Sequence, residues 1–340
     1  MSSTLVIQPL PGIGDMVWHL PALTAIAALQ PERRIDLLTK RRSHADGLLR
    51  GQTWLDRVLW LERGDEGLHS GMHGLLHLAG QLRAQAYRQV WLLHPSPRYG
   101  LLAALARIPQ RYGYGMGLQR LFLNRGPFLR GARRLHPLAR QSRYLDLLRR
   151  QGILKESAPD HPALAVAAGL EFPAQLGPAP LMAYGIGCSE ADRRWPAERF
   201  AQLIQRSLDA FGGTHILLGS GADQVLVDSI RACLKPGDTD RLVVYLDRPL
   251  DQVVALLAGV DLFVGNDTGV MNIAAAVGCP TLGLFGRPIS AVLAGYFPAL
   301  TPIYPAREGM DAIEVAQVFD GMVAMLKERF AMRNESEIVE

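Results

Sequence analysis

Short apolar runs alternate with longer stretches of helical periodicity along the whole chain. The first half has predicted strands at 4–10, 34–40, 56–62 and 89–95, and predicted helices at 16–30 and 73–85. The second half has predicted strands at 181–187, 214–220, 242–246, 261–265 and 281–286, and predicted helices at 196–211, 222–234, 249–260 and 311–330. Strands that alternate with helices form parallel sheets covered on both faces, so the pattern predicts an α/β protein.

The two alternating halves are separated by residues 156–180, which are rich in proline and alanine. A chain of 340 residues has room for two domains, each with its own core. We therefore predict two doubly wound, Rossmann-like domains, at 1–170 and 171–340, which face each other across a central cleft. Ligands of such sheets bind at the carboxyl ends of the strands. The polar residues from about 333 onward are predicted to fray.

Composition indicates a soluble globular protein, with 49% hydrophobic and 20% charged residues. No apolar run is long enough to span a bilayer, and the N-terminus lacks the basic region of a signal peptide. Three cysteines, far apart in the sequence, indicate no disulfide framework and a reducing compartment. The predicted location is the cytoplasm.

Charge is distributed unevenly between the two halves. Residues 1–170 contain 23 Lys/Arg and 11 Asp/Glu, a net charge of +12, whereas residues 171–340 have a net charge of −8. Residues 98–150 alone contain 12 arginines and one acid, Asp146. The stretch is either an ordinary solvated surface or a face for a polyanion.

The most informative motif is "GNDTGVMNIAAA" at residues 265–276, which follows a predicted strand. Asp267 or Thr268 is a suitable N-cap, and Gly269 allows another group to approach the backbone closely. The free N–H groups of the new helix would suit a phosphate. A capped turn without any ligand is the alternative, in which case Ala274–Ala276 only pack the helix on its sheet.

A second motif is "PGIGDMVWHLPAL" at residues 11–23, after the first predicted strand. Gly12 and Gly14 match part of a dinucleotide fingerprint, but Val17 stands where the third glycine would be. Asp15 lies at the head of the helix that follows. Its carboxylate either caps that helix or faces the cleft as a general base.

The third motif is "GIGCSEADRRWP" at residues 185–196. Here a strand ends, a polar loop carries Arg193 and Arg194, and Trp195-Pro196 opens a helix. An arginine in this place could clamp a pyrophosphate. Alternatively, the two arginines are a surface pair and Trp195 is a packing residue.

Together, and in this order, the three motifs resemble the bacterial lipopolysaccharide heptosyltransferase family, glycosyltransferase family 9. The matching stretches are Gly14-Asp15 with Leu20–Leu23, Arg193–Pro196, and Asp267–Ala276, and the resemblance covers about residues 4–325. Asn272 departs from the family pattern, which usually has histidine there. Asparagine can donate a hydrogen bond but cannot become cationic near neutral pH.

The resemblance implies an inverting enzyme of GT-B type that moves a sugar, heptose from ADP-heptose, onto a phosphorylated lipopolysaccharide core or a related glycan. It implies an acceptor-binding first domain, a donor-binding second domain and a last helix, about 311–330, that packs back on the first. The implied partners are an ADP-sugar, an anionic glycolipid and the inner face of the inner membrane. Neither a metal nor another cofactor is implied.

Residue by residue, the resemblance makes Asp15 the base that deprotonates the acceptor. The implied acceptor-binding residues are Gly12, Gly14 and Arg120. The implied donor-binding residues are Cys188, Ser189, Arg193, Asp223, Asp267, Thr268, Gly269, Val270 and Asn272.

Several alternatives remain open on the sequence alone. The chain could use another nucleotide sugar, could be a nucleotide-sugar epimerase of the same architecture, or could be a sugar-nucleotide-binding protein without turnover. Asp238-Thr239-Asp240 is a possible metal motif away from the three turns, and His69, His73 and His77 are predicted to share an ordinary helix face. No nucleic-acid-binding module is recognisable, so no nucleic-acid partner is predicted.

Overall fold

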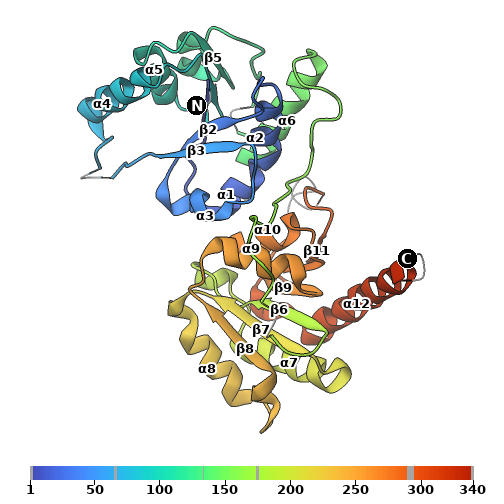
Figure 1. Ribbon diagram of the computed structural model, residues 1–340. Coiled ribbons are helices and arrows are strands. Elements are labelled where there is room, and N and C mark those ends of the chain that lie inside the picture. Colours follow the sequence, from blue (N-terminus) through green and yellow to red (C-terminus); the bar gives the residue numbers. More distant parts are fainter. Residues whose placement is uncertain (1–2, 65–66, 133, 174–175, 289–294, 338–340) are drawn as a thin grey trace. The chain divides into compact units, whose positions relative to one another are not determined.

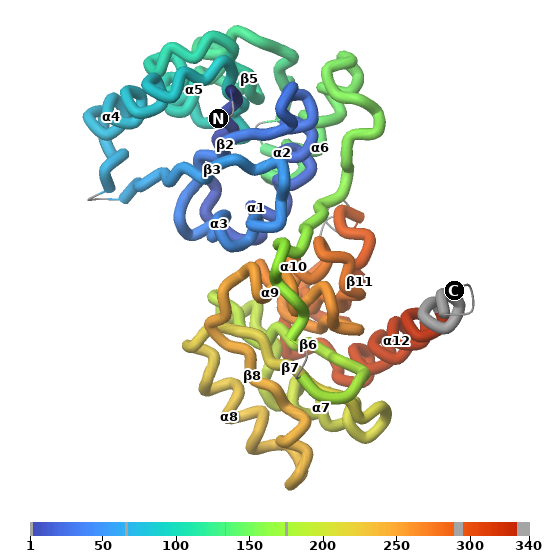
Figure 2. The backbone as a smooth tube through the Cα atoms, in the orientation of Figure 1, coloured from blue at the N-terminus to red at the C-terminus, as the bar shows by residue number. Residues whose placement is uncertain are grey.

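The chain forms two compact units, Met1–Leu164 and Ala165–Glu340, each built around its own parallel sheet (Figure 1). The computed structural model describes all residues except 1–2, 65–66, 133, 174–175, 289–294 and 338–340. The division follows Leu164, six residues before the predicted boundary at 170. Each sheet takes its strands from one half of the chain only, as the colours along the tube show (Figure 2).

The first unit has a five-stranded sheet in the order β3-β2-β1-β4-β5. Its strands are β1 (Thr4–Ile7), β2 (Ile35–Thr39), β3 (Leu55–Trp60), β4 (Gln89–Leu92) and β5 (Gln110–Gly113). All the pairings are parallel. This order is that of a doubly wound sheet, in which the winding direction changes between β1 and β4.

Helices cover both faces of this sheet. They are α1 (Ile13–Trp18), α2 (Leu20–Ala28), α3 (Ala45–Leu48), α4 (Gly71–Ala84), α5 (Pro97–Leu105) and α6 (Pro137–Arg150), with short 3-10 turns η1 (Arg41–Ser43) and η2 (Gly117–Phe122). Leu5 and Ile7 of β1 share a buried cluster with α4 and α5. Because side chains alternate along a strand, Val6 faces the opposite side. There α2 packs on β2, as Figure 1 shows.

The second unit has a six-stranded parallel sheet in the order β11-β10-β9-β6-β7-β8. Its strands are β6 (Leu181–Gly185), β7 (Thr214–Gly219), β8 (Leu242–Leu246), β9 (Leu262–Asn266), β10 (Thr281–Leu284) and β11 (Leu300–Ile303). This sheet is also doubly wound, and its winding direction changes between β6 and β9.

Helices cover this second sheet as well. They are α7 (Ala197–Phe211), α8 (Gln224–Cys233), α9 (Leu250–Gly259), α10 (Gly269–Ala276) and α12 (Val315–Glu337), with 3-10 turns η3 (Ala191–Arg193), η4 (Gly221–Asp223), η5 (Asp238–Arg241) and η6 (Met310–Ala312). Apolar side chains of α7, α8 and α12 share one buried cluster with the sheet, whereas α9 and α10 pack on each other. The described contacts of α12 include α7, β9 and β10 of its own unit. Its packing on the first unit stays a prediction.

The structure corrects several sequence predictions. Residues 281–286 are not the last strand, because β11 follows them, and its Pro302 is tolerated at the edge of the sheet. The helix predicted at 16–30 is two helices, since Pro21 cannot continue the hydrogen-bond ladder of α1. Helix α12 extends to Glu337, so the predicted frayed tail is wrong over that range. None of the helices in the described part of the chain is both long and apolar enough to cross a lipid bilayer.

Candidate functional site

The turn between β9 and α10 presents an open helix N-terminus. Thr268 is the N-cap residue with extended backbone angles, and in the described structure its side chain makes no capping hydrogen bond. The N–H groups of Gly269, Val270 and Met271 begin α10, so they have no acceptor within the helix. Residues Asp267–Val270 are only half-buried. The turn can therefore receive an anion.

Arg193 brings the "DRRWP" loop, which follows β6, to this turn. Its Nη2 donates to Oδ2 of Asp267 over 2.8 Å and also to the backbone carbonyl of Asp267. Its Nη1 donates to Oε1 of Glu190 over 3.1 Å. Because β6 and β9 are the neighbours at which the winding changes, both loops leave the sheet at its switch point, where ligands of such sheets bind.

Burial and the ion pair between Arg193 and Asp267 shift the pKa of each group in opposite directions. Burial raises the pKa of the Asp267 carboxyl, while Arg193 acts in the opposite direction. Burial also disfavours the charge of Arg193, but Asp267 and Glu190 outweigh it, and the pKa of the guanidinium is raised. Arg193 therefore stays charged and fixed in direction, with donors left over for a second anion.

Asn266 holds the two loops together, a role that none of the three sequence motifs indicated. The side chain is fully buried; its Nδ2 donates to the carbonyl of Ile186 over 3.0 Å, and its Oδ1 accepts from the Trp195 backbone N–H over 2.9 Å. Trp195 is buried too, and its Nε1 donates to the carbonyl of Ile313 over 3.1 Å. One amide thus spans both ends of the loop that carries Arg193. The polar residue at the end of an apolar strand was the available signal.

Cys188 and Ser189 lie in the same loop as Arg193. Cys188 is buried, and its backbone carbonyl accepts from Nη2 of Arg194. Ser189 is exposed. The Ser189 hydroxyl is therefore accessible, whereas the Cys188 side chain is buried. The predicted contacts of both residues with the sugar donor stay predictions.

Asp223 lies in η4, after β7, beside the start of the same loop. Its Oδ2 accepts from both the backbone N–H and the hydroxyl of Ser220, each over 2.8 Å. A Cβ at Gly187 would stand 2.3 Å from that oxygen, so the glycine is needed for this close approach. The carboxylate therefore has a capping role in the structure, and the donor contact that the resemblance implies for it stays a prediction.

Asn272 is buried in the first turn of α10. Its Nδ2 donates to the backbone carbonyl of Thr268 over 2.9 Å, which fixes the residue that precedes the helix. The side chain thus stabilises the turn from within the helix. Its direct contact with the donor diphosphate stays a prediction.

Asp15 occupies the first turn of α1, at the switch point of the first sheet. Its Oδ2 accepts from the N–H of Gly12, the N-cap residue, over 3.1 Å. Oδ1 makes no hydrogen bond to any other residue that the structure describes. Burial raises the pKa of the carboxyl, whereas the Gly12 N–H and the charge of His136 lower it. Capping and general-base roles are thus compatible, because each needs a different oxygen.

Two histidines that no sequence motif indicated, His19 and His136, act on Asp15, and a third, His94, acts on His19. Nδ1 of His19 donates to the carbonyl of Asp15 over 2.6 Å. Burial lowers the pKa of His19 to about 4 and that of His94 to about 4, so both rings are neutral at pH 7. His136 caps α6 by accepting from the Leu138 N–H over 3.3 Å, and its ring lies edge-on to Trp18 of α1. No sequence motif joins α1 to α6, which explains the omission.

The other predicted residues are placed as follows. Gly14 lies within α1, whereas Arg120 lies in η2 and stacks over the ring of Phe128 with a separation of 3.8 Å. His69 precedes α4 and accepts from the Glu62 N–H, so the predicted shared helix face of the three histidines is wrong. Among the residues that the structure describes, no three His, Cys, Asp or Glu side chains are grouped to hold a metal ion.

Comparison with known proteins defines first the class and then the family. The solved structure of the E. coli ADP-heptose LPS heptosyltransferase II shares this fold with a TM-score of 0.75 at 22% identity, over 96% of this chain and 98% of that chain. The fold is thus that of GT-B glycosyltransferases, as predicted. A family model described as glycosyltransferase family 9 (heptosyltransferase) matches residues 75–301. The chain belongs to this family and is a glycosyltransferase.

Two curated relatives agree with this family. Lipopolysaccharide heptosyltransferase 2 of Salmonella typhimurium is 26% identical over 305 residues, 83% of this chain and 82% of the relative. Lipooligosaccharide heptosyltransferase 2 of Haemophilus influenzae is 27% identical over 299 residues, again 83% of this chain and 82% of the relative. The predicted resemblance is therefore confirmed.

Replacement of Asn266 tests its role as the clamp of the Arg193 loop. Asn266→Ala leaves the buried Ile186 carbonyl and Trp195 N–H without partners, so we expect the free energy of unfolding to fall by about 2–3 kcal/mol. Urea denaturation followed by tryptophan fluorescence measures this change. Ser189→Ala, in the exposed part of the same loop, is the control and should unfold like the wild type. Equal denaturation midpoints for Asn266→Ala and Ser189→Ala would contradict the assignment.

Proposed function

We propose that the chain transfers heptose from ADP-heptose to a phosphorylated lipopolysaccharide core, with inversion at the anomeric carbon. The observation that carries the proposal is the position of Arg193 beside the open N-terminus of α10, in a chain of the heptosyltransferase family. The name of the E. coli structure supports an ADP-sugar donor, and the names of the curated relatives support a lipopolysaccharide acceptor.

The donor diphosphate would bind to the second unit. Arg193 and the N–H groups of Gly269 and Val270 would contact its phosphate oxygens. The negative charge on these oxygens grows as the bond to the sugar breaks, so the same groups would stabilise the transition state. Ser189, Asp223 and Asn272 are proposed to complete the donor site, and Asp267 to keep Arg193 in place.

The acceptor would bind to the first unit, with its reacting hydroxyl at Asp15. The free Oδ1 would take the proton of that hydroxyl as the oxygen forms its bond to the anomeric carbon. The bond between that carbon and the diphosphate oxygen breaks in the same step, and ADP leaves with the electron pair. Asp15 suits the role of base because its Oδ1 is a carboxylate oxygen without a hydrogen-bond partner among the described residues, whereas Nδ1 of His19 already donates to the Asp15 carbonyl.

We also propose that the reaction needs no metal ion and takes place at the cytoplasmic face of the inner membrane. The positive charge that a metal would bring to the diphosphate is supplied by Arg193 and the helix N-terminus. The membrane location follows from the lipid-linked acceptor that the relatives' names imply. Among the alternatives, another nucleotide sugar would fit the same diphosphate contacts. The melting-temperature experiment below distinguishes it from ADP-heptose.

Donor binding should raise the melting temperature of the protein. ADP-heptose is expected to stabilise the wild type by mass action, whereas Arg193→Ala should lose most of the shift because it loses the diphosphate clamp. Differential scanning fluorimetry with ADP-heptose, UDP-glucose and ADP measures the effect. Arg206→Ala, on helix α7, is the control and should keep the wild-type shift. A shift with UDP-glucose but not with ADP-heptose would contradict the donor assignment.

Replacement of Asp15 should abolish transfer but not donor binding. Asp15→Asn keeps an oxygen for the Gly12 N–H but cannot accept a proton, so we expect kcat to fall at least about 100-fold. The base must be ionised to act, and burial raises its pKa. The acidic limb of the kcat profile should therefore lie above pH 3.8, the ordinary Asp value. Wild-type turnover by Asp15→Asn would exclude Asp15 as the base.

Metal removal tests the remaining part of the proposal. Transfer in 5 mM EDTA is expected to match transfer in 5 mM magnesium, within roughly two-fold, because the diphosphate charge is met by protein groups. Initial rates at saturating donor give the comparison. A loss of activity in EDTA that magnesium or manganese restores would show that a metal takes part.

A further inference from the structure

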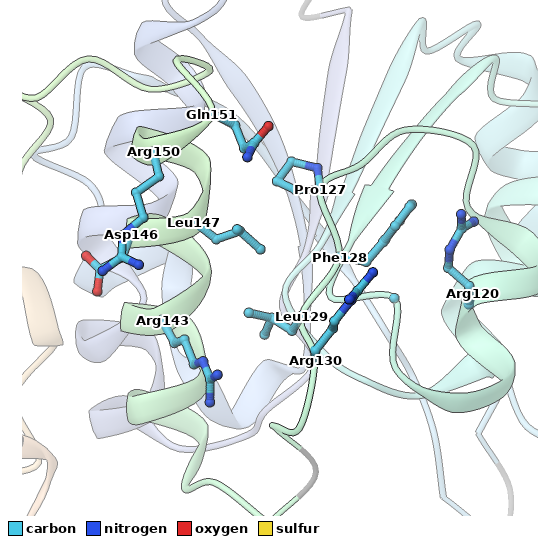
Figure 3. A pocket seen from close by; sticks show the side chains of 11 residues that line it. Arg120, Pro127, Phe128, Leu129, Arg130, Arg143, Asp146, Leu147, Arg150 and Gln151 are labelled. Carbon is cyan, nitrogen blue, oxygen red and sulfur yellow. The ribbon is translucent and has the colours of Figure 1, made fainter.

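A basic groove of about 930 Å³ lies on the first unit, and its lining includes Arg120 but not Asp15 (Figure 3). Helix α6 forms one wall with Arg143 and Arg150, and segment 127–130 forms the other with Arg130. Arg120 of η2 also lines the groove. Part of the arginine-rich stretch 98–150 is therefore gathered around one hollow.

The second wall is built on a glycine. Gly115 has a φ of +69°, and a Cβ there would stand 2.3 Å from the ring of Phe128. Phe128 can therefore pack flat against the backbone at Gly115. Arg120 stacks on the Phe128 ring with a separation of 3.8 Å, a cation–π contact that keeps the guanidinium at the rim. The arginine is thus held in place without a carboxylate.

The charge of the groove is not neutralised by neighbouring acids. Asp146 is the one carboxylate in the lining, and its Oδ1 accepts from Nη1 of Arg149 over 3.2 Å. Arg130, Arg143 and Arg150 form no ion pair with any carboxylate in the described part of the chain. All three side chains are exposed. An array of unpaired guanidinium groups suits phosphate oxygens, which arginine binds through two parallel hydrogen bonds.

Exposed leucines stand next to this charge. Turn η2 carries Leu118, which is 67% exposed, and Leu121, which is 76% exposed. Leu118 also lines a smaller hollow of about 250 Å³ together with Arg140. Turn η2 thus contributes Arg120 to the basic groove and Leu118 to a hollow that contains one arginine. The two exposed leucines flank Arg120 in the sequence of the turn.

The basic groove also has a defined relation to Asp15 within the first unit. Helix α6 begins after His136, whose charge acts on Asp15, and Arg143 and Arg150 lie further along the same helix. At about 1.5 Å per residue they stand roughly 10 and 20 Å along the axis from His136. The groove and the base are therefore joined by one rigid element.

We propose that η2 and the basic groove dock the enzyme on a membrane surface that carries anionic phospholipids. Leu118 and Leu121 enter the headgroup layer, and the arginines of the groove bind lipid phosphates. A soluble phosphate would use the arginines but leave the two leucines in water, which is why we favour the membrane. The proposal rests on the proposed function in one respect, the lipid-linked acceptor, which docking would bring to Asp15.

Vesicle co-sedimentation tests the docking surface without any turnover. The full-length protein is mixed with vesicles of phosphatidylcholine, with or without 30% phosphatidylglycerol. We expect the wild type to bind the anionic vesicles, less so as salt is raised, and to bind neutral vesicles weakly. Arg130→Gln, Arg143→Gln and Arg150→Gln combined should lower the partition coefficient roughly 100-fold, because each arginine near an anionic leaflet contributes about five-fold.

The two leucines have their own test. Leu118→Asp with Leu121→Asp should lower the partition coefficient at least roughly ten-fold, because the charges cannot enter the headgroup layer. Val225→Asp is the matched control, since Val225 of α8 is 71% exposed and lies outside the surface. Arg42→Gln, Arg83→Gln and Arg88→Gln combined are the charge control, with exposed arginines elsewhere on the first unit. Both controls should lose less than about two-fold.

The outcomes separate the docking surface from the proposed function. Failure of the wild type to bind anionic vesicles, or equal losses in the controls, would overturn docking. Release by 10 mM inorganic phosphate at constant ionic strength would do the same, because the groove would then prefer a soluble anion. Transfer to a short water-soluble acceptor should stay at the wild-type rate in the Leu118 and Leu121 double variant. If the wild type binds vesicles but does not transfer heptose to the water-soluble acceptor, the proposed function is wrong and the docking proposal still holds.

Discussion

The candidate donor site depends on one buried amide, that of Asn266. Parallel strands β6 and β9 lie side by side, but the loops that leave them are irregular, and their backbone polar groups need partners. Asn266 supplies a donor to one end of the β6 loop and an acceptor to the other. Because both ends are fixed, Arg193 reaches Asp267 at a defined distance. An apolar residue of similar size could fill the space but could not tie the loop down.

Much of this arrangement follows from local sequence. Each of the three motifs lies directly after a strand, and parallel strands deliver their carboxyl ends to one edge. This rule alone places Arg193 and Asp267 near each other, although 74 residues separate them. It also places Asp15 at the switch point of the first sheet. Strands that are buried on both faces have nearly continuous apolar sequences, and such runs predicted the central strands of both sheets and the order of the domains.

The remaining features depend on tertiary contacts that no local pattern encodes. Strands β5 and β11 lie at sheet edges, where burial is partial, and their sequences "QRYG" and "LTPI" lack a continuous apolar run. His19, His94 and His136 lie just after α1, just after β4 and just before α6, which only the folded unit brings together. The groove likewise needs Gly115 and Phe128 to meet across twelve residues. Asp223 has a capping role that its sequence position did not indicate, and its contact with the donor stays a prediction.

The separation of the two sheets along the chain has a consequence for how the protein is made. Every strand of the first sheet precedes residue 114, and α6 ends at Arg150, so the ribosome releases a complete folding unit before the second sheet exists. Domains generally fold in this order during synthesis. The nascent chain at that stage carries the +12 charge of the first half without the −8 of the second. A half-made molecule is therefore more strongly basic than the finished one, and its attraction to anionic surfaces is greatest before translation ends.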